Sequence, residues 1–295
     1  MLWVILTLLG AAGQTARNSL QRELTPRLGA LGATLVRFLF GFPFALLFLC
    51  SLLLWSGAAL PKTNAAFAGW TLVGAFTQIA ATALMLLTME RRSFVVTVAY
   101  LKTEPLLVAL LGVTLLGDHL TTLMAAAILL ATAGVALISV KPKALQGGGA
   151  MPVLLGLSSA ALFAGSAIGY RGAILALHRT DYLLPATFAL ATGLTLQTLL
   201  LLSWLLVFKR ATLRAIFALW KPSLLAGFAG AAASEFWFLA FALATAASVR
   251  TLALVEVVFA QAVSKFVFKQ KTTLAEAAGM ALLVTGAGLI VWAGT

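Results

Sequence analysis

Residues 93–116 read SFVVTVAYLKTEPLLVALLGVTLL, an apolar run long enough to cross a bilayer as a helix. Lys102 and Glu104 lie near its middle, where an ionised side chain costs about 2.5–3.5 kcal/mol on insertion scales. Pro105 removes a backbone donor at the same depth. The stretch either lines a polar cavity or is a kinked helix whose Lys102 and Glu104 pair with neighbours. We favour the cavity because a second copy of the pattern appears later in the chain.

The composition indicates a helical membrane protein that crosses the bilayer many times. Of 295 residues, 62% are hydrophobic and 9% charged, whereas a soluble chain carries about 25% charge. The apolar runs do not alternate with polar residues as β-barrel strands do. The net charge of +12 comes from small basic groups between apolar runs, which is a topology signal and not a nucleic-acid-binding face. The single cysteine, Cys50, excludes an internal disulfide and a cysteine metal cluster, and we expect no cofactor.

We expect ten transmembrane helices, arranged as two inverted five-helix repeats over residues 1–144 and 150–295. The polar, glycine-rich linker at 141–149 separates the repeats. Loops are expected at 23–27, where Pro26 lies, and at the basic segment 209–221. The ten spans are expected at residues 1–20, 29–54, 65–87, 93–116, 120–140, 153–175, 183–208, 223–244, 249–268 and 272–292.

The repeat is predicted from three offsets that agree within two residues. Glu104 matches Glu256 at an offset of 256 − 104 = 152, and Arg17 matches Arg171 at 171 − 17 = 154. Residues 130–133 (LATA) match residues 283–286 (LVTG) at 283 − 130 = 153. Because five is odd, the second half enters the membrane inverted relative to the first. This is the architecture of secondary transporters, whose substrate site lies between the halves near the bilayer midplane.

Several segments resemble the drug/metabolite transporter superfamily in its ten-helix EamA branch. They are YLKTEPLLVALLG at 100–112, LGDHL at 116–120, AGVALI at 133–138 and VRF at 36–38. Asp118 stands where members commonly have Glu, and Val257 where the first copy has Pro105. The resemblance implies a carrier for small metabolites, often an exporter of amino acids or related compounds, with a central cavity lined by both halves. It does not imply a particular substrate.

The basic residues between spans predict an orientation. The loops after odd-numbered spans hold twelve, namely Arg22, Arg27, Arg91, Arg92, Lys141, Lys143, Lys209, Arg210, Arg214, Lys221, Lys269 and Lys271. The loops after even-numbered spans hold two, Lys62 and Arg179. The positive-inside rule then places both termini outside the cell, whereas the family resemblance implies both termini inside.

Seven polar residues within the spans are our candidates for substrate binding: Gln14, Asn18, Gln78, Tyr100, Glu104, Glu235 and Glu256. Gln14, Arg17, Asn18 and Gln21 share one helical face, which lines a cavity or forms the interfacial end of the helix. The buried carboxylates either bind a cationic group or carry a proton, or they pair internally with Arg17, Arg171, Arg250 or Lys102.

Helical spacing also predicts in which direction the side chains of residues 93–116 point. Tyr100 and Glu104, four residues apart, are expected to share a face. Lys102 is expected to face away from that cavity, because it is only two residues from Glu104.

The motifs favour transport over catalysis. Both histidines, His119 and His178, lie in or beside expected loops, and the chain has no HExxH, GxSxG or P-loop motif. We expect a secondary transporter of small organic solutes, an exporter in a bacterial inner membrane, acting as a monomer or homodimer without nucleic acid. The alternatives are a passive channel or facilitator, an uptake carrier for a vitamin-like solute, and a non-transporting scaffold.

Overall fold

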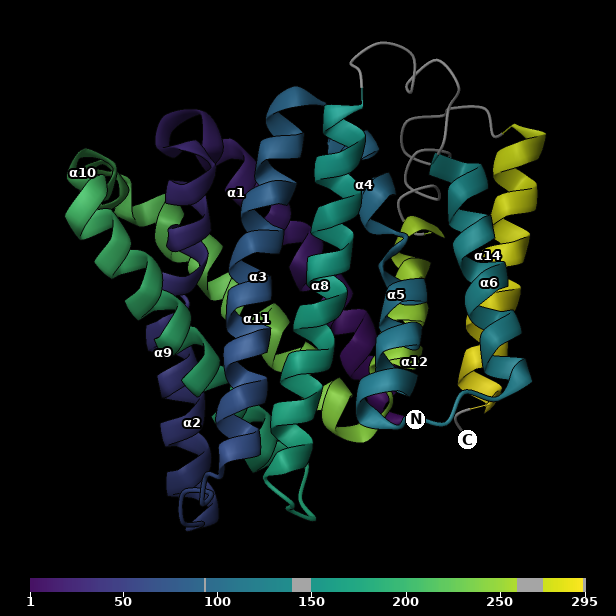
Figure 1. The fold of residues 1–295 in the computed structure, drawn as a ribbon, viewed down its shortest axis with the longest axis horizontal. Helices are drawn as coiled ribbons and strands as arrows, with labels where there is room; N and C mark the ends of the chain where they lie inside the picture. Colours follow the sequence, from purple (N-terminus) through teal and green to yellow (C-terminus); the bar gives the residue numbers. More distant parts are fainter. Residues whose placement is uncertain (93, 140–149, 259–272, 294–295) are drawn as a thin grey trace.

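The computed structural model describes residues 1–92, 94–139, 150–258 and 273–293, and these parts of the chain are helical with short connections (Figure 1). Within these residues, seven helical segments are long and apolar enough to cross a membrane: Leu2–Ser56, Ala65–Arg91, Val96–Leu116, Met151–Ala176, Leu183–Phe208, Trp220–Leu243 and Leu274–Ala293. Thr122–Ile138 is a shorter apolar helix. The prediction of an all-helical, multi-pass membrane protein is confirmed, while ten spans and an inverted repeat stay predictions.

The described helices of the first half run in chain order as follows: α1 (Leu2–Leu39), α2 (Phe42–Ser56), α3 (Ala65–Arg91), α4 (Phe94–Leu101), α5 (Glu104–Leu111), the π-helix η1 (Gly112–Leu116) and α6 (Thr122–Ser139). Those of the second half are α8 (Met151–Ala176), α9 (Leu183–Phe208), α10 (Arg210–Ala218), α11 (Trp220–Leu243), α12 (Ala246–Leu252), the 3₁₀-helix η2 (Ala253–Val255) and α14 (Leu274–Ala293). The predicted linker at 141–149 and the second half of the predicted ninth span, with Gln261 and Lys265, lie outside the described residues.

Two predicted loops are wrong. Residues 23–27 continue α1 through Pro26, and the chain bends instead at Gly29, whose φ of 69° favours glycine. The segment 209–221 contains α10, a short helix with Arg210 and Arg214 among its apolar residues. The prediction that a helix ends near Pro26 is therefore wrong. Arg210 and Arg214, which lie in the other predicted loop, belong to an amphipathic helix.

The opening stretch is a broken helix. It stops after Leu101, turns at Lys102 and Thr103, and resumes at Glu104. Pro105 lies in the first turn of α5. A backbone N–H at this position would have no intrahelical acceptor, so the proline costs the helix no hydrogen bond. The spacing rule that placed Tyr100 and Glu104 on one face, and Lys102 on another, assumed a continuous helix. Because the helix is broken, that assumption is wrong, and Tyr100, Lys102 and Glu104 do not point in the predicted directions relative to one another.

Small residues bring the most extensively packed helix pairs together, which are α3 with α8, α1 with α11 and α6 with α14. At the α6–α14 crossing, a Cβ added to Gly134 would lie 2.5 Å from the Gly279 carbonyl oxygen. A Cβ on Gly279 would lie 2.6 Å from the Gly134 carbonyl oxygen. Only hydrogen atoms fit between these backbones, so the two glycines allow α6 and α14 to pack closely.

We expect Gly279→Ala to lower the thermal unfolding midpoint in detergent, because the added methyl group meets backbone that cannot rotate away. Overpacking of this kind costs about 1–3 kcal/mol. Gly288→Ala is the matched control on the same helix, because nothing lies within 4 Å of its added Cβ. Equal unfolding midpoints for the two variants would show that the α6–α14 contact is not tight.

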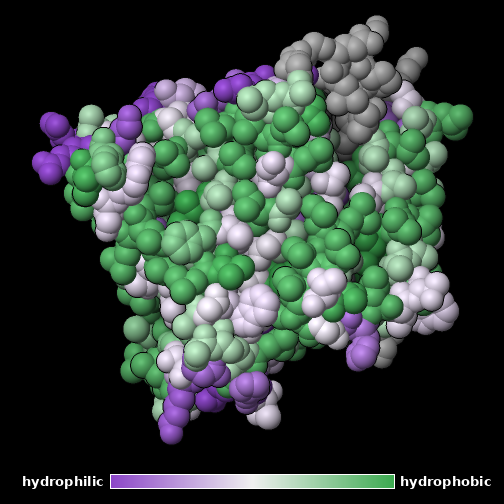
Figure 2. All heavy atoms as spheres, in the orientation of Figure 1, coloured by the Kyte–Doolittle hydropathy of each residue, from purple (hydrophilic) through white to green (hydrophobic). Residues whose placement is uncertain are grey.

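Basic residues gather at one end of the molecule. Arg22 and Arg27 precede the bend in α1, Arg91 ends α3, and Arg210 and Arg214 lie on α10; these segments reach the upper end in Figure 1. Figure 2 shows hydrophilic residues along that end and a broad hydrophobic band below it. Beside α10, Trp220 is 51% exposed and stacks under the Lys221 ammonium, 5.7 Å from the ring centre. Such pairs are typical of the membrane–water interface.

Candidate functional site: a charged cavity between the two halves of the chain

A cavity of about 40 Å³ lies among α1, the α4–α5 break, α8 and the α12–η2 segment. A volume of about 10–15 Å³ holds one water molecule, so about three would fit. The cavity is lined by Gln14, Arg17, Asn18, Met85, Val98, Leu101, Lys102, Glu104, Pro105, Phe163, Arg250, Ala253, Leu254 and Glu256. Five of these side chains are ionisable, which is an unusual content for the interior of a membrane protein.

Ion pairs around the cavity join the two halves of the chain. Arg250 Nε lies 3.0 Å from Glu104 Oε1, and the Lys102 ammonium pairs with the Glu256 carboxylate. Glu256 also accepts a hydrogen bond of 3.1 Å from the Thr15 hydroxyl. Each pair has one member before residue 140 and one after residue 150. The two carboxylates that match in the predicted repeat thus each bind a cation from the opposite half.

The break between α4 and α5 explains how Lys102 reaches the cavity. Lys102 occupies the turn after α4, and Glu104 begins α5, so they do not follow one helical face. Both line the cavity, contrary to the prediction that Lys102 points elsewhere. The break between α4 and α5 therefore brings two opposite charges to one cavity. Irregular backbone at this depth is tolerated where it lines a cavity.

Arg250 lies between a carboxylate and an indole ring. Its guanidinium carbon is 4.4 Å from the Trp237 ring centre, a cation–π contact from α11, opposite the Glu104 ion pair. The indole reaches this position because α1 has no side chain at Gly10, where an added Cβ would be 3.1 Å from the ring. The α1–α11 packing thus fixes the orientation of Arg250.

A second, smaller cavity of about 10 Å³ shares Gln14, Phe163 and Arg250 with the first, so the two are neighbours. Its other lining residues are Arg37, Gln78, Ser166, Ala167, Tyr170, Ser234, Trp237, Phe238 and Phe241. Arg37 donates to the Thr82 hydroxyl at 3.0 Å, and Gln78 accepts from Gln197 at 2.8 Å. Polar groups therefore continue from the first cavity toward the far end of α8.

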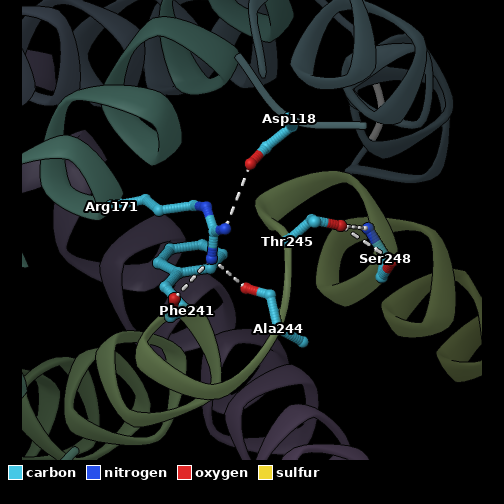
Figure 3. A network of polar contacts seen from close by, with 6 residues as sticks. All are labelled: Asp118, Arg171, Phe241, Ala244, Thr245 and Ser248. Atoms are coloured by element: carbon cyan, nitrogen blue, oxygen red, sulfur yellow. Dashed lines mark hydrogen bonds and ion pairs between the residues drawn. The ribbon is translucent and has the colours of Figure 1, made fainter. Parts of the chain in front are cut away.

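A third ion pair lies where α8 meets the C-terminal end of α11 (Figure 3). Arg171 of α8 lies 3.1 Å from Asp118 Oδ1 and donates to the carbonyl oxygens of Phe241, at 2.8 Å, and Ala244. The carbonyls at a helix C-terminus lack intrahelical partners, so a guanidinium there satisfies the end of α11. Thr245 then caps α12 by accepting from the Ser248 backbone N–H.

The approach of Asp118 depends on the π-helix that precedes it. The Asp118 N–H donates to the Gly112 carbonyl at 3.0 Å, and a Cβ on Gly112 would lie 2.9 Å from Asp118 Oδ2. The wider turn and the glycine fold the carboxylate back under the helix end. Like the two ion pairs at the first cavity, the Asp118–Arg171 pair joins the two halves.

The structure brings five of the seven sequence candidates to the two cavities. Gln14, Asn18, Glu104 and Glu256 line the first, and Gln14 and Gln78 line the second. Tyr100 packs instead against Gly156 of α8, where an added Cβ would lie 2.4 Å from the ring. Glu235 accepts a hydrogen bond of 2.5 Å from Thr187 and lines neither cavity.

The structure adds four basic residues to the candidates: Arg17, Arg37, Lys102 and Arg250. The sequence signal was present, because a buried arginine or lysine costs as much as a buried carboxylate. From the sequence, Arg17, Lys102 and Arg250 are possible partners of the carboxylates, and Arg17 also lies on the polar face of the first span. Arg37 stands out only as part of the VRF segment. For Lys102 and Arg250 the pairing alternative is correct.

The fold and the cavity define a multi-pass helical membrane protein with a polar site between its halves. Residues 1–140 of the chain match the EamA-like transporter family, which confirms the sequence resemblance. A solved crystal structure of another protein covers 99% of this chain and 96% of its own, with a TM-score of 0.69 at 14% identity, so the two share a fold. No curated protein sequence matches the chain. The first half of the chain is thus similar to EamA-like transporters.

Proposed function

We propose that the protein is a secondary transporter of small organic solutes that works by alternating access around the charged cavity. The observation that carries this proposal is that three ion pairs, none with a side chain more than 19% exposed, each join the first half of the chain to the second. Ion pairs between two rigid bodies can form in one arrangement and break in another. A scaffold gains nothing evident from their insertion cost.

We further propose that the chain makes ten crossings as two inverted repeats, over residues 1–144 and 150–295. A 55-residue helical stretch would extend about 80 Å if straight, far more than a bilayer of about 30 Å, so the bend at Gly29 supports two crossings there. The helix pairs α1–α11 and α8–α3 are related by exchanging the halves, and α6–α14 is related to itself. Both observations are those that an inverted repeat predicts.

The proposed cycle follows from where the ion pairs lie. The Asp118–Arg171 pair and the α11 carbonyls close one end, while Lys102–Glu256 and Glu104–Arg250 surround the central cavity. Breaking the closing pair would let the halves rock and expose the cavity to that end. The second cavity lies between the centre and the closing pair, on that route. We place the protein in a bacterial inner membrane as an exporter, in keeping with the family resemblance.

A passive channel is the competing proposal, and counterflow separates the two. Purified protein is first screened by thermal shift against amino acids, nucleosides, vitamins and cationic drugs. The stabilising compound is then loaded unlabelled into proteoliposomes, and the labelled form is added outside. A carrier accumulates label transiently above equilibrium, whereas a pore only equilibrates it. Equilibration without overshoot would reject the carrier.

A further inference from the structure

We propose that the cavity binds a small organic anion, whose carboxylate lies between Arg17 and Arg37. This inference rests on the proposed function, because it names the substrate class of the same site. Each of these two arginine residues is 2% exposed. Among the described residues, neither has a carboxylate within ion-pair distance.

In the described part of the chain, the two guanidinium groups donate their hydrogen bonds to neutral acceptors. Arg17 Nε and Nη2 donate to Asn18 Oδ1 at 3.2 and 2.7 Å, and Arg37 Nη1 donates to the Thr82 hydroxyl at 3.0 Å. The Arg37 Nε has no hydrogen-bond partner in the described part of the chain. A buried, charged donor without an acceptor is costly, and a bound anion would supply the acceptor.

The two side chains lie next to each other because α11 has a glycine beneath them. A Cβ added to Gly230 would be 3.3 Å from Arg17 Cδ and 3.3 Å from Arg37 Cγ. Arg17 lines the first cavity and Arg37 the second, and Gln14 lines both. An anion at the junction of the cavities could therefore reach both guanidinium forks, whose geometry suits a carboxylate.

The charge balance of the site supports the same class of ligand. The two cavities are lined by four cations, Arg17, Arg37, Lys102 and Arg250, and two carboxylates, Glu104 and Glu256, so the sum is 4 − 2 = +2. Both carboxylates are already paired with cations, which leaves no acid for a cationic solute. The rings of Phe163, Trp237 and Phe238 in the second cavity provide apolar surface for the organic part of the anion.

The test measures thermal unfolding of the purified full-length protein in detergent. The probes are formate, acetate, inorganic phosphate, chloride, the neutral acetamide and the cation putrescine. We expect formate or acetate to raise the midpoint by about 3 °C or more at saturating concentration, and acetamide and putrescine to leave it unchanged. Stabilisation by phosphate or chloride alone would overturn the organic anion in favour of an inorganic one. Stabilisation by putrescine alone would overturn the anion altogether.

Variants separate binding from folding. Arg17→Met and Arg37→Met should abolish the shift with carboxylates and should raise the ligand-free midpoint, because each removes a buried charge that has no carboxylate within ion-pair distance among the described residues. Arg250→Met is the matched control, and it should lower the ligand-free midpoint by leaving Glu104 unpaired. A lowered ligand-free midpoint for both Arg17→Met and Arg37→Met, with the carboxylate shift retained, would contradict the inference.

The outcome also distinguishes this inference from the proposed function. Carboxylate binding that depends on Arg17 and Arg37, without counterflow, would support the anion site and reject the transporter. Counterflow of a neutral or cationic solute at the wild-type rate in Arg17→Met would support the transporter and reject the anion site.

Discussion

Asp118→Asn and Arg171→Met are expected to open the end of the protein where α11 meets α12. Each change removes one partner of a buried ion pair, which costs about 3–5 kcal/mol. Arg171→Met also leaves the Phe241 and Ala244 carbonyls without their donor. Since about 1.4 kcal/mol changes an equilibrium tenfold, even a third of this cost would shift the closed arrangement by an order of magnitude.

The opening can be measured by thiol labelling from each side of the membrane. Cys50 is the single cysteine, so Cys50→Ser gives a background without reactive thiols. Ser166 lines the second cavity and is 2% exposed, so Ser166→Cys reports whether water reaches the cavity. We expect an impermeant maleimide to label this cysteine at least about ten times faster in the Asp118→Asn background, and from one side of the membrane only.

A nearby ion pair serves as the control for this experiment. Arg179 Nε lies 2.7 Å from Asp181 Oδ2 in the connection after α8, with the two side chains 36% and 40% exposed. Exposed pairs contribute about 0–1 kcal/mol, so Arg179→Met should leave the labelling rate of Ser166→Cys unchanged. If folded Asp118→Asn and Arg171→Met proteins label no faster than Arg179→Met, the Asp118–Arg171 pair does not close the cavity.

The sequence predicted the class of fold because hydrophobic length and charge depletion are properties of each segment alone. Where it failed, the outcome depended on contacts between segments. Pro26 reads as a break but is tolerated within α1, whereas Gly29 bends the chain with a positive φ that no pattern of polarity reveals. In the opening stretch, the break at Lys102 and Thr103 changed the direction of every side chain counted across it.

The sequence predicted that the candidate site contains buried charged residues, but it identified only some of the residues that line the cavities. Buried charge is costly in any helix, so Glu104 and Glu256 could be singled out from the sequence. Glu235 met the same criterion, yet it lies on the side of α11 that contacts Thr187 of α9. Which face of a helix meets the cavity depends on packing such as that of Gly10 against Trp237, and one sequence does not specify that contact.

The second large effect is expected at the Glu104–Arg250 pair, where a double-mutant cycle separates transport from stability. Glu104→Gln removes the negative charge but leaves Arg250 stacked on Trp237, so we expect a folded protein with no counterflow activity. Arg250→Met leaves the carboxylate of Glu104, which is 8% exposed, without its partner, and should cost about 3–5 kcal/mol of stability.

The double variant Glu104→Gln/Arg250→Met tests whether the ion pair is needed for transport or only holds the two halves together. With both charges gone, neither residue leaves the other unpaired, so the unfolding midpoint should return to within a few degrees of the wild type. Transport should stay absent, because the ionisable groups that the cycle needs are missing. Wild-type counterflow in Glu104→Gln, or its recovery in the double variant, would mean that the pair only holds the two halves together. Stability restored without transport would instead show that the protein folds without the two charges. The pair, whose insertion into the membrane is costly, would then be needed for transport and not for folding.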